Sequence, residues 1–237
     1  MKRIYIFFIT ALLVCSGIKA QWSVGLMAGY DYNFYSYEKE FAYDYRYGNK
    51  EGFELSIPVQ YNFCDWLGVR ADISYVQKGH TMHRTGVYEG QYTDTRDHYM
   101  HLPLMLSFSF GGRKVRGWFN PGGYIGYWVA SHWEGVTQMI NGPNGEYYIS
   151  HDETMAYHFS EKVKFMDQRD NRLDAGLTGV IGVGWRFMPQ LELRVEGVCW
   201  YSLVNRESGS SGNIAPRYDS TLAARIGLAY SFGKGNK

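Results

Sequence analysis

The seven histidines are the side chains best able to bind a metal, and all of them lie in the middle third of the chain. They are His80, His83, His98, His101, His132, His151 and His158. Imidazole binds zinc and copper, but a site needs several rings directed at one point. His80 and His83 are three residues apart, as are His98 and His101, and this spacing places the two side chains of each pair on opposite faces of a strand. Two interpretations stay open: loops that gather imidazoles into a surface metal site, or polar loops that simply contain histidine. No metal ligand is assigned.

A second group of residues is of the kind that hydrolases use. His151 is followed by Asp152 and Glu153, which suit an acid–base pair. Candidate nucleophiles occur in a Gly/Ser-rich segment and are Ser208, Ser210 and Ser211. A hydrolase of this type needs a nucleophile, a base and an orienting acid, and the sequence has no GxSxG elbow. It also has no dinucleotide fingerprint, P-loop or calcium loop. We therefore expect no enzymatic activity, no catalytic residues and no cofactor.

The first 20 residues have the layout of a secretory signal peptide. The basic pair Lys2-Arg3 precedes an apolar run over residues 4–18, and Ala20 supplies a small residue for cleavage. The run is shorter than the roughly 20 residues that a membrane-spanning helix requires. We expect residues 1–20 to be a cleaved signal peptide and residues 21–237 to form one domain. The alternatives are an uncleaved anchor and a lipoprotein acylated at Cys15, which the bulky Val14 disfavours.

Cleavage after Ala20 leaves two cysteines, Cys64 and Cys199. The pattern around them places Cys64 in a turn near one rim of the domain and Cys199 on a strand nearer the other. We expect them not to form a disulfide. The absence of CxxC and Cys/His spacings excludes a zinc ribbon and a disulfide scaffold.

Composition narrows the class of protein. The chain is 45% hydrophobic and 20% charged, with a net charge of +1 and a mean hydropathy of −0.34. There is no basic excess that would indicate nucleic acid binding, and the low hydropathy argues against a helical membrane protein. Aromatic residues reach 17%, and there are 28 glycines. Abundant aromatic and glycine residues without long apolar runs are typical of membrane β-barrels.

Apolar residues alternate with polar ones in eight segments. These begin at Trp22, Phe53, Leu67, Met100, Val115, Leu173, Leu191 and Leu222. Each has about the ten residues of a tilted transmembrane strand. The fifth segment is ambiguous in its facing, and we favour Phe119, Ile125, Tyr127 and Val129 on its apolar face. The connections are short at residues 62–66, 111–114 and 188–190. They are long at residues 33–52, 79–99, 132–171 and 204–217.

This alternation of short and long connections predicts an all-β fold: an eight-stranded antiparallel up-and-down transmembrane β-barrel with short periplasmic turns and long extracellular loops. A soluble barrel with an apolar interior also alternates, but eight strands enclose too little space for the large aromatic set. The apolar face is therefore expected to contact lipid. Aromatic residues near strand ends suit interfacial belts. They are Trp22, Tyr30, Tyr32, Tyr61, Trp66, Trp185 and Tyr230.

Acidic and basic residues balance on the face assigned to the lumen. The acids are Asp31, Glu54, Asp72, Asp174, Glu192, Glu196 and Asp219. The bases are Arg70, Lys78, Arg116, Arg172, Arg186, Arg194 and Arg225. Buried charges need partners, so we expect salt bridges that plug the barrel and block solutes larger than ions or water.

The long loops are the expected site of any partner. The first carries many aromatic residues in a charged stretch: Tyr32, Phe34, Tyr35, Tyr37, Phe41, Tyr43, Tyr45 and Tyr47. Exposed tyrosines suit protein or glycan contact, although packing between loops explains them equally well. In the third loop, Asn141 to Glu146 reads as the turn of a hairpin that extends the barrel strands above the membrane.

With the strands placed, the sequence resembles the PorT-like outer-membrane β-barrel family of Bacteroidetes. The cues are VGLMAG at 24–29, HLPLML at 101–106, PGGYIGY at 121–127, DAGL at 174–177 with GVG at 182–184, LELR at 191–194 and YSF at 230–232. The resemblance implies the barrel, the bacterial group and the outer membrane, and implies no catalytic residues. The closing Phe232 resembles the signal that barrel-assembly machinery recognises, although five residues follow it.

Taken together, these features predict an exported integral protein of the Gram-negative outer membrane, surrounded by its lipid. We expect a non-enzymatic role in which surface loops bind a partner or the barrel supports the envelope. The alternative is a porin-like narrow channel or a small-solute-binding barrel, and the third possibility is a loop-based surface enzyme.

Overall fold

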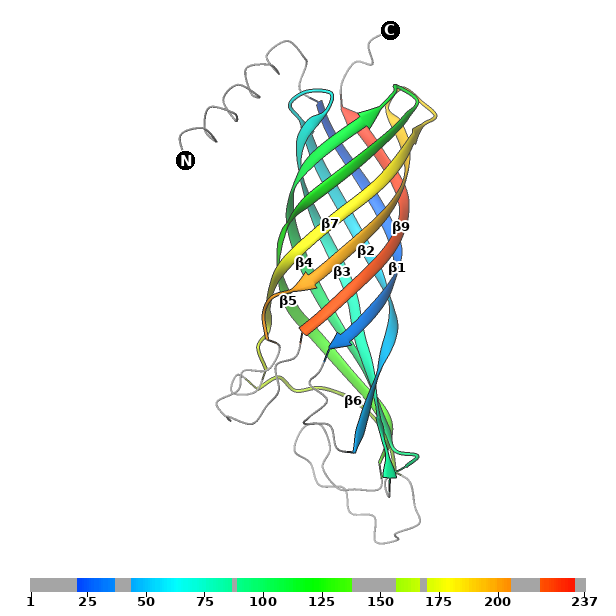
Figure 1. Cartoon of the computed structure of the whole chain (residues 1–237), viewed down its shortest axis with the longest axis vertical. Helices are drawn as coiled ribbons and strands as arrows, with labels where there is room; N and C mark the ends of the chain where they lie inside the picture. Colours follow the sequence, from blue (N-terminus) through cyan, green and yellow to red (C-terminus); the bar gives the residue numbers. More distant parts are fainter. Residues whose placement is uncertain are drawn as a thin grey trace.

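The computed structural model describes residues 21–36, 44–86, 89–137, 157–166, 170–205 and 218–232. They form a tilted β-barrel that continues at one end into a narrower ribbon (Figure 1). The strands are β1 (Gln21–Ser36), β2 (Tyr45–Asn62), β3 (Leu67–Arg84), β4 (Tyr92–Gly111), β5 (Val115–Thr137), β6 (Tyr157–Lys162), β7 (Leu173–Arg186), β8 (Leu191–Ser202) and β9 (Tyr218–Phe232). Among the described residues there is no helix with the length and apolar character needed to cross a membrane.

Eight of these strands close into a ring. The sheet order is β4-β3-β2-β1-β9-β8-β7-β5-β6, and an additional β4–β5 pairing joins its two sides. The closing pair is antiparallel and runs from Trp22↔Phe232 to Ser36↔Tyr218. Closure gives every strand of the ring a partner on both sides, as hydrocarbon surroundings require. The predicted eight-stranded barrel is confirmed, and β6 lies outside the ring, paired with β5 alone.

The three short turns are confirmed, and they lie at the end where β1 begins and β9 ends. The β4–β5 turn shows why its sequence is Gly-Gly-Arg-Lys. Gly111 has a φ of +112°, a left-handed conformation that side chains disfavour. The next residue, Gly112, donates its N–H to the carbonyl of Val115 at 2.9 Å. In outer-membrane barrels such turns face the periplasm.

Three of the four long loops were predicted too long, because the strands continue past the barrel. The β3–β4 connection is residues 85–91 rather than 79–99, since Gly79↔Arg96 to His83↔Tyr92 are paired. Likewise β1 extends to Ser36, β2 begins at Tyr45, and β5 runs to Thr137. These extensions are polar on both faces, so the alternation that marks a half-buried strand is missing. The expected turn at residues 141–146 and residues 206–217 lie outside the described part.

The apolar face is the outer one, as predicted. Among its residues Leu104 is 68% exposed, Leu173 67% and Ile125 64%. The facing chosen for β5 is confirmed, since Phe119, Tyr127 and Val129 are also exposed. A continuous apolar surface around a whole barrel is not compatible with water and requires lipid.

Aromatic rings gather at both borders of this apolar surface. At the turn end Trp22 packs on Tyr61, with ring centroids 4.8 Å apart, and Tyr230 packs on Phe232 at 4.9 Å. The cysteine prediction is also confirmed: Cys64 is buried in the β2–β3 turn, Cys199 is exposed on β8, and both are free. Residues 1–20, the expected signal peptide, lie outside the described residues.

Beyond the barrel, five strands form an open sheet that we call the extracellular ribbon. It consists of residues 45–50 of β2, 79–84 of β3, 92–97 of β4, 131–137 of β5, and β6. In Figure 1 it extends below the ends of β7, β8 and β9.

Candidate functional site

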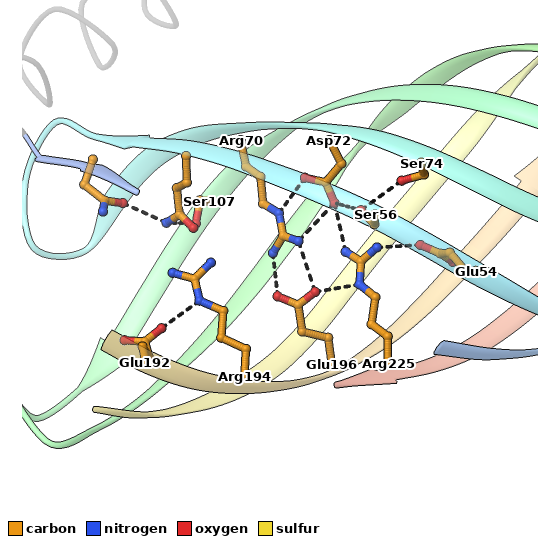
Figure 2. Close-up of polar contacts among 12 residues, drawn as sticks. Glu54, Ser56, Arg70, Asp72, Ser74, Ser107, Glu192, Arg194, Glu196 and Arg225 are labelled. Carbon is orange, nitrogen blue, oxygen red and sulfur yellow. Dashed lines mark hydrogen bonds and ion pairs between the residues drawn. The ribbon is translucent and has the colours of Figure 1, made fainter. Parts of the chain in front are cut away.

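The lumen contains a layer of ion pairs, which we call the ionic layer. Arg70 on β3 donates to Asp72 Oδ1 from Nε at 2.8 Å and to Glu196 Oε1 from Nη1 at 2.6 Å. Arg225 on β9 donates to Glu196 Oε2 at 2.7 Å, Glu54 Oε1 at 2.5 Å and Asp72 Oδ2 at 2.9 Å. All five side chains are at most 2% exposed. Figure 2 shows the two guanidinium groups between carboxylates that come from opposite walls of the barrel.

Neutral side chains complete the ionic layer, in which three carboxylates face two guanidinium groups. Trp200 donates its indole N–H to Glu54 Oε2 at 3.1 Å. Ser56 donates to Asp72 Oδ2 at 3.3 Å and accepts from Ser74 at 3.0 Å. These donors satisfy carboxylate oxygens that the arginines leave open, so the layer is a connected network rather than separate pairs.

A second cluster lies on the extracellular side of the ionic layer, around Asp174 of β7. Lys78 Nζ is 3.0 Å from Asp174 Oδ2, and Ser202 donates to Oδ1 at 2.6 Å. Tyr124 also donates to Oδ2, at 3.2 Å. His101 is fully buried, with Nε2 3.3 Å from the same oxygen. This cluster places a second set of buried polar contacts in the lumen.

Large aromatic side chains also fill the lumen, which the sequence interpretation missed. It assigned the inner face to small and charged residues, yet Trp118, Tyr124 and Trp200 are at most 4% exposed there. Trp118 and Tyr124 fit because inner-face glycines stand opposite: a Cβ on Gly182 would come within 2.7 Å of the Trp118 ring, and one on Gly176 within 2.8 Å of the Tyr124 ring. The signal lies in the register, which the structure supplies: it pairs Trp118↔Gly182 and Tyr124↔Gly176. A Trp or Tyr opposite a glycine on the next strand indicates an inward ring.

Most of the fourteen predicted lumen charges lie where expected. Ten are buried: Asp31, Glu54, Asp72, Asp174, Glu192, Glu196, Arg70, Lys78, Arg194 and Arg225. Asp219, Arg116 and Arg186 are partly exposed toward the ends of the barrel. Arg172 was assigned wrongly. It precedes β7, and its guanidinium carbon stacks 4.5 Å from the centre of the outward-facing Tyr127 ring.

One predicted acid lacks the partner that was expected for it. Asp31 is fully buried, and neither of its carboxylate oxygens has a hydrogen-bond donor among the described residues. The expectation that every lumen charge is paired is therefore too simple for this position.

The structure separates the described histidines rather than gathering them. His101 is in the lumen, and His98, three residues earlier, faces outward, as their spacing predicts; there it contacts the hydroxyl of Tyr75. His80 stacks on Tyr35 with centroids 4.2 Å apart, and His132 contacts Ser160. Within the described ranges, no group of three His, Cys, Asp or Glu residues is placed to hold a metal ion. His151, with Asp152 and Glu153, falls outside those ranges.

The ionic layer and the Asp174 cluster predict a low conductance for the barrel. We expect the reconstituted protein to show no large stable unit conductance in planar bilayers, because ion pairs and aromatic rings fill the cross-section between the walls. The measurement is single-channel recording at symmetric high salt, with a water-filled porin inserted in a parallel membrane as the reference. Stable steps as large as those of the porin would contradict a plugged lumen.

Comparison with known families supports the architecture. A model of the family described as outer membrane protein beta-barrel domain matches residues 19–205. The chain belongs to this family. The outer membrane named in the family's description is consistent with the apolar outer surface of this barrel. The protein is an outer-membrane β-barrel that sits in membrane lipid.

Solved structures similar to this chain are also outer-membrane proteins. The attachment invasion locus protein Ail of Yersinia pestis is 14% identical, with 89% of this chain and 98% of that chain covered and a TM-score of 0.44. OprG of Pseudomonas aeruginosa is 12% identical, with 90% and 95% covered and a TM-score of 0.47. The outer membrane protease OmpT of Escherichia coli is 11% identical, with 90% and 96% covered and a TM-score of 0.42. No curated protein matches the sequence.

Proposed function

We propose that this protein is a non-enzymatic scaffold of the outer membrane whose plugged barrel holds a partner-binding ribbon at the cell surface. The observation that carries the proposal is the extracellular ribbon itself. Strands β3, β4 and β5 have 18, 20 and 23 residues, whereas β7 and β8 have 14 and 12. Roughly ten residues suffice to cross the bilayer, so the longer strands extend well beyond it.

The extracellular ribbon has no apolar core of its own among the described residues. Its buried positions are Gly79, Thr95, Asp97, Ser131 and Gly135, none of which carries a large apolar side chain. Most of its other residues are partly exposed, on both faces of the sheet. An isolated sheet of this kind gains little from burial and is held by the barrel below it. A sheet with two accessible faces is well suited to bind a partner.

Aromatic rings are concentrated where β1, β2 and β3 enter the extracellular ribbon. Tyr35 stacks on His80 at 4.2 Å and lies 5.0 Å from Tyr47. Further along, Arg84 stacks over the Tyr45 ring at 4.6 Å. The tyrosines of the predicted first loop are thus partly in strands, and Tyr37, Phe41 and Tyr43 lie outside the described residues. Ordered rings with polar edges contact proteins and glycans at a low entropic cost.

Replacing the stacked rings tests the proposal. We expect Tyr47→Ser combined with His80→Ser to weaken binding of the surface partner at least about tenfold, as loss of a central aromatic contact does. Intact cells that display the wild type, this double variant or a control variant would be compared on glycan arrays and in cross-linking pull-downs. The control is Trp66→Ser, an exposed aromatic at the periplasmic end. Binding that is equal in all three proteins would contradict a role for the extracellular ribbon.

The proposal also includes the subgroup of the family, the cleavage of a signal peptide and the route of membrane insertion. The sequence cues support a place in the PorT-like group of Bacteroidetes, cleavage of a signal peptide after Ala20, and insertion by the barrel-assembly machinery through the strand ending at Phe232. The absence of enzymatic activity rests on the missing motifs. A narrow channel is the less favoured function, because the ionic layer and the Asp174 cluster occupy the lumen.

A further inference from the structure

A small polar cavity of about 30 Å³ lies in the lumen at the periplasmic mouth. Its lining comes from strand ends next to the short turns: Gln21, Ser23, Gln60, Asn62, Ser109, Arg116, Trp118, Arg186, Glu192, Arg194 and Ser231. Figure 2 places Glu192 and Arg194 on the turn side of the ionic layer, so this cavity is separate from it. This volume counts only the positions open to the centre of a water-sized atom, and the cavity opens to solvent at its mouth.

The cavity carries a surplus of positive charge. Three arginines, Arg116, Arg186 and Arg194, line it together with one acid, Glu192, which leaves a net charge of two. Glu192 is already engaged by two of them: Arg194 donates to Oε1 from Nε at 2.7 Å, and Arg186 Nη2 is 3.5 Å from Oε2. No carboxylate of the cavity lining is left for Arg116.

Several donors in the cavity wall have no acceptor. Trp118 is 4% exposed, and no acceptor among the described residues reaches its indole N–H. The same holds for the Ser23 hydroxyl and for Nε of Arg116 and of Arg186. The face of the Trp118 ring lies 5.1 Å from the Arg194 guanidinium carbon, which holds both side chains in place. Buried donors without partners are rare and call for a ligand that accepts.

We infer that this cavity is a binding site for a phosphate group presented from the periplasm. A phosphate group supplies several acceptor oxygens for the unpartnered donors. A free phosphate carries about −1.5 to −2 and the phosphodiester of a lipid headgroup about −1, so the positive surplus attracts both. Arginine is the side chain that best recognises phosphate through paired N–H donors. The group belongs either to a soluble phosphate or to the headgroup of an inner-leaflet phospholipid.

Calorimetric titration of the full barrel in phosphate-free buffer and a maltoside detergent tests the site. The first probe is inorganic phosphate and the second is soluble dihexanoyl phosphatidylglycerol. If only inorganic phosphate gives a saturable heat of binding, the ligand is a soluble phosphate. If the short lipid binds more tightly than inorganic phosphate, the ligand is a lipid headgroup. The absence of saturable binding for both probes would overturn the inference.

Three variants separate binding from a structural effect. Arg116→Gln is expected to weaken binding about tenfold or more, because a charge-assisted hydrogen bond is lost. Glu192→Gln removes the competing carboxylate and is expected to tighten binding about fivefold. Arg113 is an exposed arginine in the β4–β5 turn, outside the cavity lining, and Arg113→Gln is expected to bind as the wild type does. A heat-dependent gel shift confirms that each variant is folded, and any other order of affinities would overturn the inference.

Discussion

Replacing Arg225 with Met is expected to destabilise the barrel by about 3–5 kcal/mol, the cost of leaving buried charges without their partner. Arg225 is 2% exposed and contacts Glu54, Asp72 and Glu196. Without it, Arg70 alone faces three carboxylates inside a closed lumen. Water has little access to these groups, and aliphatic Met offers no donor. The measurement is urea unfolding in lipid vesicles, followed by the gel mobility of folded and unfolded protein.

A change on the acidic side of the same network serves as the matched comparison. Glu54→Gln leaves two carboxylates facing Arg70 and Arg225, so charge balance improves while one hydrogen bond is lost. We expect a cost of about 1–2 kcal/mol, clearly below that of Arg225→Met. Arg113→Met, in the exposed β4–β5 turn, controls for loss of an arginine. Equal unfolding midpoints for Arg225→Met and the wild type would show that the ionic layer does not stabilise the barrel.

Replacing Asp174 with Leu is the second change with a large expected effect, again about 3–5 kcal/mol. Its carboxylate is the acceptor for Lys78, Tyr124 and Ser202. The Lys78 side chain is 2% exposed and pairs with Asp174, so without Asp174 its ammonium group remains a buried charge that has lost its carboxylate. Unfolding in vesicles under the same conditions measures the loss.

A double-mutant cycle distinguishes the ion pair from general packing. Lys78→Met together with Asp174→Leu replaces two charges by apolar groups of similar size, which is often nearly neutral. We expect the double variant to lose clearly less stability than the sum of the two single variants, with a coupling free energy of about 2–3 kcal/mol between the two sites. Additive losses would mean that Lys78 and Asp174 act independently and that the pair is not the stabilising unit.

The polar cavity at the periplasmic mouth and the extracellular ribbon have different side-chain chemistry and lie at opposite ends of the barrel. The periplasmic mouth has a positive surplus and unpartnered donors, whereas the extracellular ribbon carries stacked rings. The ionic layer and the Asp174 cluster lie between them, and we expect these two layers to prevent direct passage of a ligand from one end to the other.

The sequence by itself determined the barrel and its facing. Alternation with a period of two depends on lipid on one side and a small lumen on the other, and both constraints act at every residue of a strand. For that reason the three short turns, the outward Phe119, Ile125, Tyr127 and Val129, and the unpaired cysteines were all predicted correctly. The balance of charges also predicted ion pairs in the lumen, since such charges cannot be buried singly.

Only the tertiary structure decided which charges meet and where the strands end. Arg70 and Glu196 are 126 positions apart in the chain, and their contact depends on barrel register, which local pattern does not encode. Of the extracellular ribbon, only a hairpin in the third loop was predicted, because strands that are solvated on both faces have no apolar alternation. The positive cavity was missed because it combines the ends of seven strands, and a surplus of charge at one mouth appears only when those ends are brought together.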